Sequence, residues 1–180
     1  MLDDAERTAV IDLARDAVTS AVMGGPVPEP PSIPPFTRVA GAFVTLTSAG
    51  ELRGCIGQVE PREPLGAVIV HCAAAAALED PRFPRVLPID LPSLRLEVSI
   101  LSPAEEVTDT DHIVVGRHGL IVSQNGLRGL LLPQVATEHG WTRGQFLEQT
   151  CRKAGLPRDA WQHGARIYRF EAEVFGERRS

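Results

Sequence analysis

The residues best able to do chemistry in this chain lie in one hexapeptide, Leu52-Arg53-Gly54-Cys55-Ile56-Gly57. Side chains alternate along a strand, so Leu52, Gly54 and Ile56 are expected on one face and Arg53, Cys55 and Gly57 on the other. A guanidinium two residues from a thiol on the same face favours the thiolate. Gly54 and Gly57 leave room beside the sulfur for a ligand or another backbone. The hexapeptide therefore predicts a reactive or ligand-facing thiol, with a small buried hydrophobe as the alternative.

Three other residues are candidates for acid–base or charge roles: Asp80 and Arg82 within Asp80-Pro81-Arg82-Phe83-Pro84, and His118 within Gly116-Arg117-His118-Gly119. Asp80 precedes a proline and leaves the helical region, so its carboxylate is free to accept backbone amides or to pair with an arginine. A structural turn with an aspartate cap is the alternative. His118, between two glycines, is expected to be sterically open, as a site residue or as an exposed turn histidine.

Cys55, Asp80 and Arg82 are expected to line one cleft between the hairpin that contains the hexapeptide and the loop after the next helix. Phe83 would bury its ring and leave Asp80 and Arg82 facing outward beside Cys55. Arg53 and Arg82 would make the cleft locally positive, which favours an anionic ligand group. The alternative is a surface ion pair between Asp80 and Arg82, worth at most about 1 kcal/mol.

The remaining cysteines indicate core packing and neither a disulfide framework nor a metal site. The chain has three cysteines, Cys55, Cys72 and Cys151. Their number is odd, they are widely spaced, and no two of them form a C-x-x-C pair. Cys72 and Cys151 lie on the apolar faces of expected helices. His71 beside Cys72 has no recognised ligand spacing. We therefore expect no metal and no cofactor, and a reducing cytoplasm as the compartment.

Composition restricts the possible partners. The 180 residues are 43% hydrophobic and 23% charged, as in ordinary globular proteins. A net charge of -5 argues against nucleic-acid binding. No apolar run is long enough for a membrane span, and the acidic start, Met1-Leu2-Asp3-Asp4, is unlike a secretory signal.

Periodicity and turn signals predict the elements that position the candidate residues. Hydrophobic spacing predicts a helix over 4–22, ended by Gly24-Gly25, and prolines make the following segment an extended connector. A capping box, Thr142 with Gln145, begins a helix that runs to Lys153. The other expected elements are a hairpin of 42–47 and 52–57, a helix over 64–79, strands over 94–100 and 113–115, a hairpin of 120–123 and 127–132, a short helix from Pro133, and a last strand over 167–175.

The order of these elements predicts an α+β fold with largely antiparallel sheets and packed helices. A hairpin, a helix and a strand occur in that order twice. This order suggests a degenerate duplication of one unit, although the two halves show no convincing residue-level match.

Several motifs together resemble one family, the AMMECR domain, known in bacteria and archaea as AmmeMemoRadiSam system protein A. The resemblance covers nearly the whole chain, and the LRGCIG hexapeptide is its most specific part. Arg85-Val86 departs from the family, which usually continues with proline and leucine there. The other motifs are Asp80–Pro84, Leu96–Leu101, His118-Gly119-Leu120, Leu131–Ala136 and Cys151–Leu156.

The resemblance implies a single α+β domain over 1–180 with a larger and a smaller lobe, comprising an N-terminal helix (1–23), a Pro-rich connector (24–35) and a body (36–180). It also implies a genomic association with a Memo-like protein and a radical SAM protein, and no particular reaction. By analogy, the prominent positions are Arg53, Gly54, Cys55, Gly57, Asp80 and Arg82.

Three functions follow as hypotheses. The first is a partner protein that docks on the other two components and holds a peptide, an anionic small molecule or a cofactor fragment in the LRGCIG cleft. The second is an enzyme with Cys55 as nucleophile, Arg53 as electrostatic activator and His118 or Asp80 as acid–base partner. The third is a redox-sensing thiol. The first is favoured, since sequence alone does not place a base near Cys55.

Overall fold

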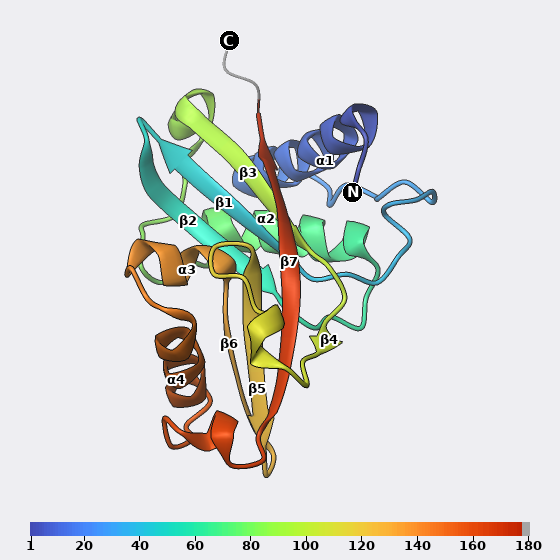
Figure 1. Cartoon of the computed structure of the whole chain (residues 1–180). Coiled ribbons are helices and arrows are strands. Elements are labelled where there is room, and N and C mark those ends of the chain that lie inside the picture. Colours follow the sequence, from blue (N-terminus) through green and yellow to red (C-terminus); the bar gives the residue numbers. More distant parts are fainter. Residues whose placement is uncertain (178–180) are drawn as a thin grey trace. The chain divides into compact units, whose positions relative to one another are not determined.

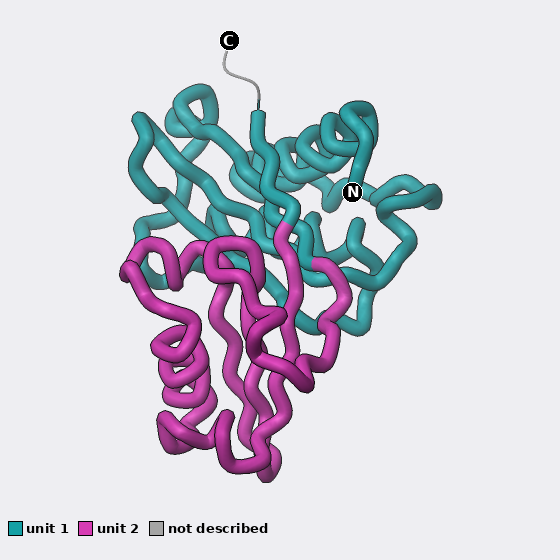
Figure 2. The backbone as a smooth tube through the Cα atoms, in the orientation of Figure 1, with its two compact units in different colours: residues 1–101, 173–180 teal, residues 102–172 magenta. Residues whose placement is uncertain are grey.

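The computed structural model describes residues 1–177, which form two compact units. Among the described residues, unit 1 contains Met1–Leu101 and 173–177, and unit 2 contains Ser102–Ala172 (Figure 2). Unit 2 is thus inserted into unit 1 in sequence. Each unit has its own hydrophobic core. Within the described residues, no helix is long and apolar enough to cross a membrane.

Unit 1 begins with α1 (Asp4–Met23), which confirms the predicted N-terminal helix (Figure 1). Asp3 and Glu6 form a capping box at its start. At its end Gly24 adopts a positive φ of 71°, which glycine accommodates without a steric penalty. Ion pairs from Arg7 to Glu173 and from Arg15 to Glu177 tie the outer side of α1 to the end of the chain.

The sheet of unit 1 contains β1 (Ala42–Ser48), β2 (Glu51–Gln58), β3 (Leu94–Leu101) and, next to β3, the end of β7 (Arg166–Gly176). The strands pair antiparallel in the order β2-β1-β3, so β2 is an edge. Burial alternates along β3, as the sequence pattern predicted, and also along most of β1. The buried side chains, such as Val44, Leu46 and Leu96, belong to one core with residues of α1 and α2.

Helix α2 (Leu65–Leu78) follows the hairpin, with Pro64 as its N-cap, and confirms the predicted helix. Its alanine-rich side packs closely on the sheet. The approach is tightest at Gly54, where a Cβ atom would stand 2.1 Å from the Ala76 carbonyl oxygen. The chain then turns through Asp80–Val86 and a 3₁₀ helix, η1 (Pro88–Ser93), into β3.

Unit 2 contains four strands, which pair antiparallel, and two α-helices. Strand order is β6-β5-β7, with β4 beside β7. Helices α3 and α4 contribute Ala136 and Phe146 to the second core. The elements are β4 (Glu105–Glu106), η2 (Thr110–His112), β5 (His118–Gln124), β6 (Leu127–Leu131), α3 (Pro133–Glu138), α4 (Arg143–Lys153), η3 (Ala160–Gln162) and β7 (Arg166–Gly176).

Most of the predicted elements of unit 2 are confirmed, including the capping box of Thr142 and Gln145 at the start of α4. The predicted strand over 113–115 is wrong. Ile113 is buried, but Val114 donates its N–H to the ring of His118, and the segment turns at Gly116, which has a φ of 89°. Strand β5 consequently starts at His118 rather than after the glycine pair.

The α+β class and the antiparallel pairing are therefore confirmed. In both units the first strand of the hairpin pairs with the second and with the strand after the helix. The second arm of each hairpin also contains Leu-Arg-Gly, at 52–54 and at 127–129. A Cβ atom at either glycine would contact the backbone at a helix: that of Ala76 at Gly54, and that of Ala154 at Gly129. The predicted duplication stays a prediction, now with a shared tripeptide to support it.

Candidate functional site

Strand β2 shifts register opposite Leu46 and Thr47, and this shift sets the position of Cys55. Gly54 pairs with Leu46 and Leu52 pairs with Thr47, which leaves Arg53 without a partner residue. The predicted face of Leu52 is therefore wrong, because the extra residue moves it to the side of Thr47. Cys55 lies opposite Thr45, and its Sγ is 3.2 Å from the Thr45 Oγ1. The thiol is half-buried.

Asp80 binds the outer edge of β2 at Cys55. One carboxylate oxygen accepts the backbone N–H of Cys55 at 2.9 Å, and both oxygens accept N–H groups of the Arg82 side chain at 2.8 and 3.0 Å. The backbone N–H of Arg82 is a further donor at 3.1 Å. These charge-assisted bonds hold the pKa of the Asp80 carboxyl well below its usual range, with the Arg82 side chain as the largest cause.

Arg82 completes the clamp on β2, because its Nη2 also donates to the Cys55 carbonyl at 3.2 Å. The Asp80–Arg82 pair thus occupies both backbone groups of Cys55 that a neighbouring strand would use. Asp80 keeps the pKa of Arg82 raised, and the Cys55 thiolate adds to this effect. Arg82 therefore stands within electrostatic range of the thiol while its side chain remains 55% exposed.

Two expectations about this loop are wrong. Asp80 does not face outward: its side chain is 2% exposed, because its four N–H donors surround it. Phe83 is only half-buried and lies under the Arg82 guanidinium at 5.3 Å. Val86 anchors the loop instead, with 2% exposure and a hydrogen bond from its N–H to the Ala77 carbonyl at 2.9 Å.

Arg53 contacts the loop after Phe83. Its guanidinium donates to the carbonyls of Pro84 at 2.6 Å and Arg85 at 3.4 Å, and lies 3.6 Å from an Asp90 carboxylate oxygen. The charge beside Cys55 that sequence analysis assigned to Arg53 is supplied by Arg82 in the structure.

The two glycines of the hexapeptide do not leave open space. The Cβ direction of Gly54 points into the backbone of α2, and that of Gly57 points into the ring of Phe43 at 2.3 Å. Glycine is needed at both positions for internal packing. The expected room for a ligand beside them is filled by the protein itself.

Cys72 and Cys151 are fully buried, as predicted from their helical faces. Burial raises the pKa of the Cys72 thiol to about 11, and burial also raises the pKa of Cys151. Neutral, inaccessible thiols are poor nucleophiles. Among residues 1–177, no group of three or more His, Cys, Asp or Glu side chains is arranged to hold a metal ion.

His118 belongs to unit 2 and is 5% exposed, so the expected open position is wrong. It is the first residue of β5, where it pairs with Glu171 of β7. The surroundings of His118 are built from unit 2, whereas Cys55, Asp80, Arg53 and Arg82 belong to unit 1.

Sequence reasoning missed Thr45, Val86 and Glu171. The hairpin turn could have suggested Thr45, but a regular register would place Gly54 there, and only the shift at Arg53 brings Cys55 opposite. Nothing in a single sequence pairs His118 with Glu171, which is 53 positions later in the chain.

The fold and the site define a class: two-unit α+β proteins with a thiol-bearing edge strand clamped by an aspartate–arginine pair. The sequence model of the AMMECR1 family matches residues 11–175. A protein of Methanosarcina acetivorans is 44% identical over 188 residues, covering 99% of this chain and 94% of its own length. One of Thermococcus gammatolerans is 45% identical over 181 residues, covering 93% and 88%.

A solved structure has the same fold. The crystal structure of an uncharacterized protein from Pyrococcus horikoshii is 39% identical, with a TM-score of 0.84 over 98% of this chain and 93% of that one. The chain described above belongs to the AMMECR1 family.

Proposed function

We propose that this chain is a binding component that acts together with a Memo-like protein and a radical SAM protein. Its site would be the edge of β2 at Cys55, and the bound group would be an anion carried by a small molecule or a peptide. The observation that carries the proposal is the exposed Arg82 guanidinium, fixed beside the half-buried thiol by a buried carboxylate.

The arrangement suits recognition because one side of the guanidinium is already occupied. Asp80 accepts from Nε and Nη2, and Cys55 accepts from Nη2. Nη1 has no hydrogen-bond partner among the described residues, so its donors are available to a ligand oxygen. A guanidinium whose orientation is held in advance binds carboxylate or phosphate oxygens at a lower entropic cost.

Catalysis by Cys55 has less support. A cysteine nucleophile needs a base within hydrogen-bond reach. The group in contact with Sγ is the hydroxyl of Thr45, which is not a base at neutral pH. The Asp80 oxygens already accept four N–H groups, and the low pKa of this carboxyl makes it a weak base.

The partner proposal is tested by capture. The tagged chain is mixed with a Memo-like protein and a radical SAM protein from the same genome, and retention of either is measured. Arg82→Ala should weaken capture at least about tenfold, equal to about 1.4 kcal/mol. Arg62→Ala, at an exposed arginine outside the site, is the matched control and should bind as the parent does.

Arg82→Lys separates folding from binding, because it keeps a cation beside Asp80 but removes the planar fork. It should melt close to the parent and still capture poorly. Failure of the parent to retain either partner, or parental capture by a folded Arg82→Ala protein, would refute the proposal. Titration with inorganic phosphate and with a capped acidic dipeptide then distinguishes a small anion from a peptide.

A further inference from the structure

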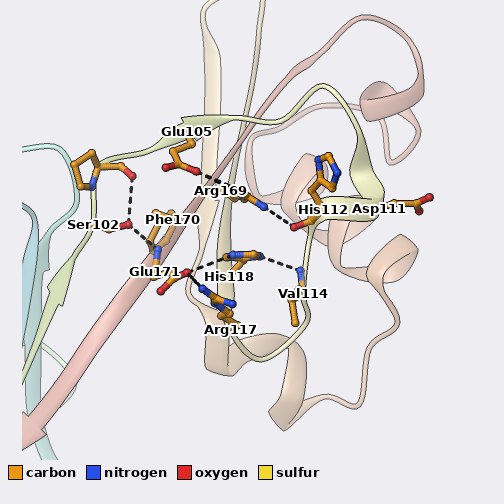
Figure 3. A pocket seen from close by; sticks show the side chains of 11 residues that line it. Ser102, Glu105, Asp111, His112, Val114, Arg117, His118, Arg169, Phe170 and Glu171 are labelled. Carbon is orange, nitrogen blue, oxygen red and sulfur yellow. Dashed lines mark hydrogen bonds and ion pairs between the residues drawn. The ribbon is translucent and has the colours of Figure 1, made fainter. Parts of the chain in front are cut away.

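A pocket of about 640 Å³ lies entirely within unit 2 (Figure 3). The segment from Ser102 to His118 and the residues Arg169–Glu171 of β7 line it. It shares no residue with the Asp80–Arg82 clamp. Figure 3 shows the His118 ring between Val114 and Glu171, with Arg117 next to Glu171.

The backbone fixes the protonation pattern of His118. Its Nδ1 lies 2.9 Å from the Val114 nitrogen, and a backbone N–H can only donate. Nδ1 is therefore the acceptor, and in the neutral ring the proton must reside on Nε2. The side chain is 6% exposed and still lines the pocket, so the ring presents one N–H donor in a fixed direction.

That donor lacks a full hydrogen bond. Nε2 lies 3.6 Å from Oε1 of Glu171, beyond hydrogen-bonding distance. Oε1 already accepts from Nε and Nη2 of Arg117, both at 2.8 Å. The other oxygen, Oε2, has no partner among residues 1–177. His118 and Glu171 thus offer a donor and an acceptor next to each other.

Arg117 orients the Glu171 carboxylate, and Ser102 holds the Glu171 backbone in place. The Glu171 N–H donates to the Ser102 Oγ at 2.9 Å, and the Ser102 N–H donates to the Glu171 carbonyl at 2.8 Å. Cross-strand pairing of Glu171 with His118 adds a third restraint. A ligand would therefore meet both groups already oriented.

The charges around His118 are balanced. Arg169 and Arg117 face it together with Glu171 and Glu105. Arg169 is itself engaged by Glu105 at 3.3 Å and by the His112 carbonyl at 2.7 Å. Burial, followed by Arg169, lowers the pKa of His118, which keeps the ring neutral near pH 7. Such a balanced field favours a neutral polar ligand group over a net anion.

We propose that this pocket binds a primary carboxamide group, whose carbonyl accepts the Nε2–H of His118 and whose N–H on the same side donates to Glu171. A primary carboxamide carries its carbonyl oxygen and one N–H side by side and has no net charge, which matches the pair that the pocket presents. In a trans peptide bond the carbonyl and the N–H point in opposite directions, so a peptide bond does not match it. The site is independent of the binding function proposed at Cys55.

The test uses acetamide as the probe on the full-length, ¹⁵N-labelled protein. Backbone amides of Val114, His118 and Glu171 should shift with a Kd on the order of 10 mM, as expected for so few atoms. Methyl acetate, which keeps the carbonyl and lacks the N–H, should bind at least about tenfold more weakly. Acetate, the charged control, should also bind more weakly.

Variants assign the two hydrogen bonds. His118→Gln keeps an N–H donor and should retain binding, whereas His118→Phe should lose at least about tenfold. His118→Phe also leaves the Val114 N–H unpaired, so a second variant is needed. Glu171→Ala removes the acceptor at a half-exposed position, where folding is little affected. It should show the same loss.

Three results would overturn the proposal: no shift at these amides at about ten times the expected Kd, equal binding of methyl acetate or acetate, or unchanged binding in folded Glu171→Ala. Selective shifts with the amide alone, lost in Glu171→Ala and retained in His118→Gln, would establish it.

Discussion

At the scale of single residues, Asp80 organises the candidate site. It is almost fully buried, yet it accepts four hydrogen bonds and so stays charged. Its hydrogen bonds join the Arg82 side chain of the loop to the edge strand β2. This contact keeps Arg82 near the Cys55 thiol, because without Asp80 the Arg82 side chain would be mobile at the surface.

The first prediction concerns that carboxylate. Asp80→Asn should lower the free energy of unfolding at pH 7 by about 2–3 kcal/mol, because the charge-assisted bonds are lost. The pKa of Asp80 is depressed in the folded protein, so its stabilisation is complete above the unfolded value of about 3.9 and declines as the pH falls toward the folded value. Urea unfolding of both proteins across pH should therefore show a gap that narrows in acid.

Asp111→Asn is the control, since Asp111 forms an exposed pair with Arg143 and should change stability by less than about 1 kcal/mol. A gap for Asp80→Asn that stays constant from neutral pH into strong acid would show that the charge is not what stabilises the loop.

The second prediction concerns the three thiols. A limiting alkylating reagent at mildly alkaline pH should modify Cys55 at least about tenfold faster than the others, because thiolate and access are both required. Cys72, with its pKa raised to about 11, and Cys151 are buried. Mass spectrometry of the native protein gives the order, and the urea-unfolded chain, in which all three should react similarly, is the control. Faster labelling of Cys72 or Cys151 would contradict the structure.

At the scale of elements, the close approach of a helix to a hairpin arm depends on one glycine in each unit. A Cβ at Gly54 would stand 2.1 Å from the Ala76 oxygen, and one at Gly129 would stand 2.3 Å from the Ala154 nitrogen. Backbone atoms cannot rotate away as a flexible side chain can. Gly54 is therefore required for the position of α2 and of the loop that contains Asp80.

The third prediction follows from this contact. Gly54→Ala should destabilise the protein by at least about 2 kcal/mol, because β2 and α2 must separate. Gly144→Ala, in α4 with no atom within 4 Å of the added Cβ, should be neutral or stabilising by up to about 1 kcal/mol. Thermal and urea unfolding measure both. Equal stability of the two variants would mean that the sheet relaxes around the new methyl group.

At the scale of the whole molecule, two cores stabilise two units. The first core includes Leu46 and Ile69, and the second includes Phe146 and Leu147. The chain passes from unit 1 to unit 2 after Leu101 and returns before Glu173. Separate cores allow separate openings.

The fourth prediction tests that separation. Phe146→Ala should cost about 3–5 kcal/mol, since Phe146 is fully buried. Amide exchange should accelerate at Leu120 and Val122 of unit 2 and stay slow at Val44 of unit 1. The matched Leu46→Ala protein should show the reverse pattern. Equal acceleration in both units would mean that the two cores unfold cooperatively.

Much of the architecture was predictable because it depends on local physics. Alternation in β3, the capping box at α4, the glycine stop of α1 and the burial of Cys72 and Cys151 each follow from a periodicity or a cap within a few residues. The strand expected over 113–115 is wrong because the chain turns there, and the Val114 N–H donates to the ring of His118 four residues later.

Most of the helices and strands, and the candidacy of Cys55, Asp80 and Arg82 as site residues, followed from the sequence alone. Only the tertiary structure decided how they meet: the register shift at Arg53 and the four bonds that bury Asp80. The same holds for the pairing of His118 with Glu171. The bond from Cys55 to Asp80 and the pairing of His118 with Glu171 join residues 25 and 53 positions apart, and their geometry is set by packing between elements, which no local pattern encodes.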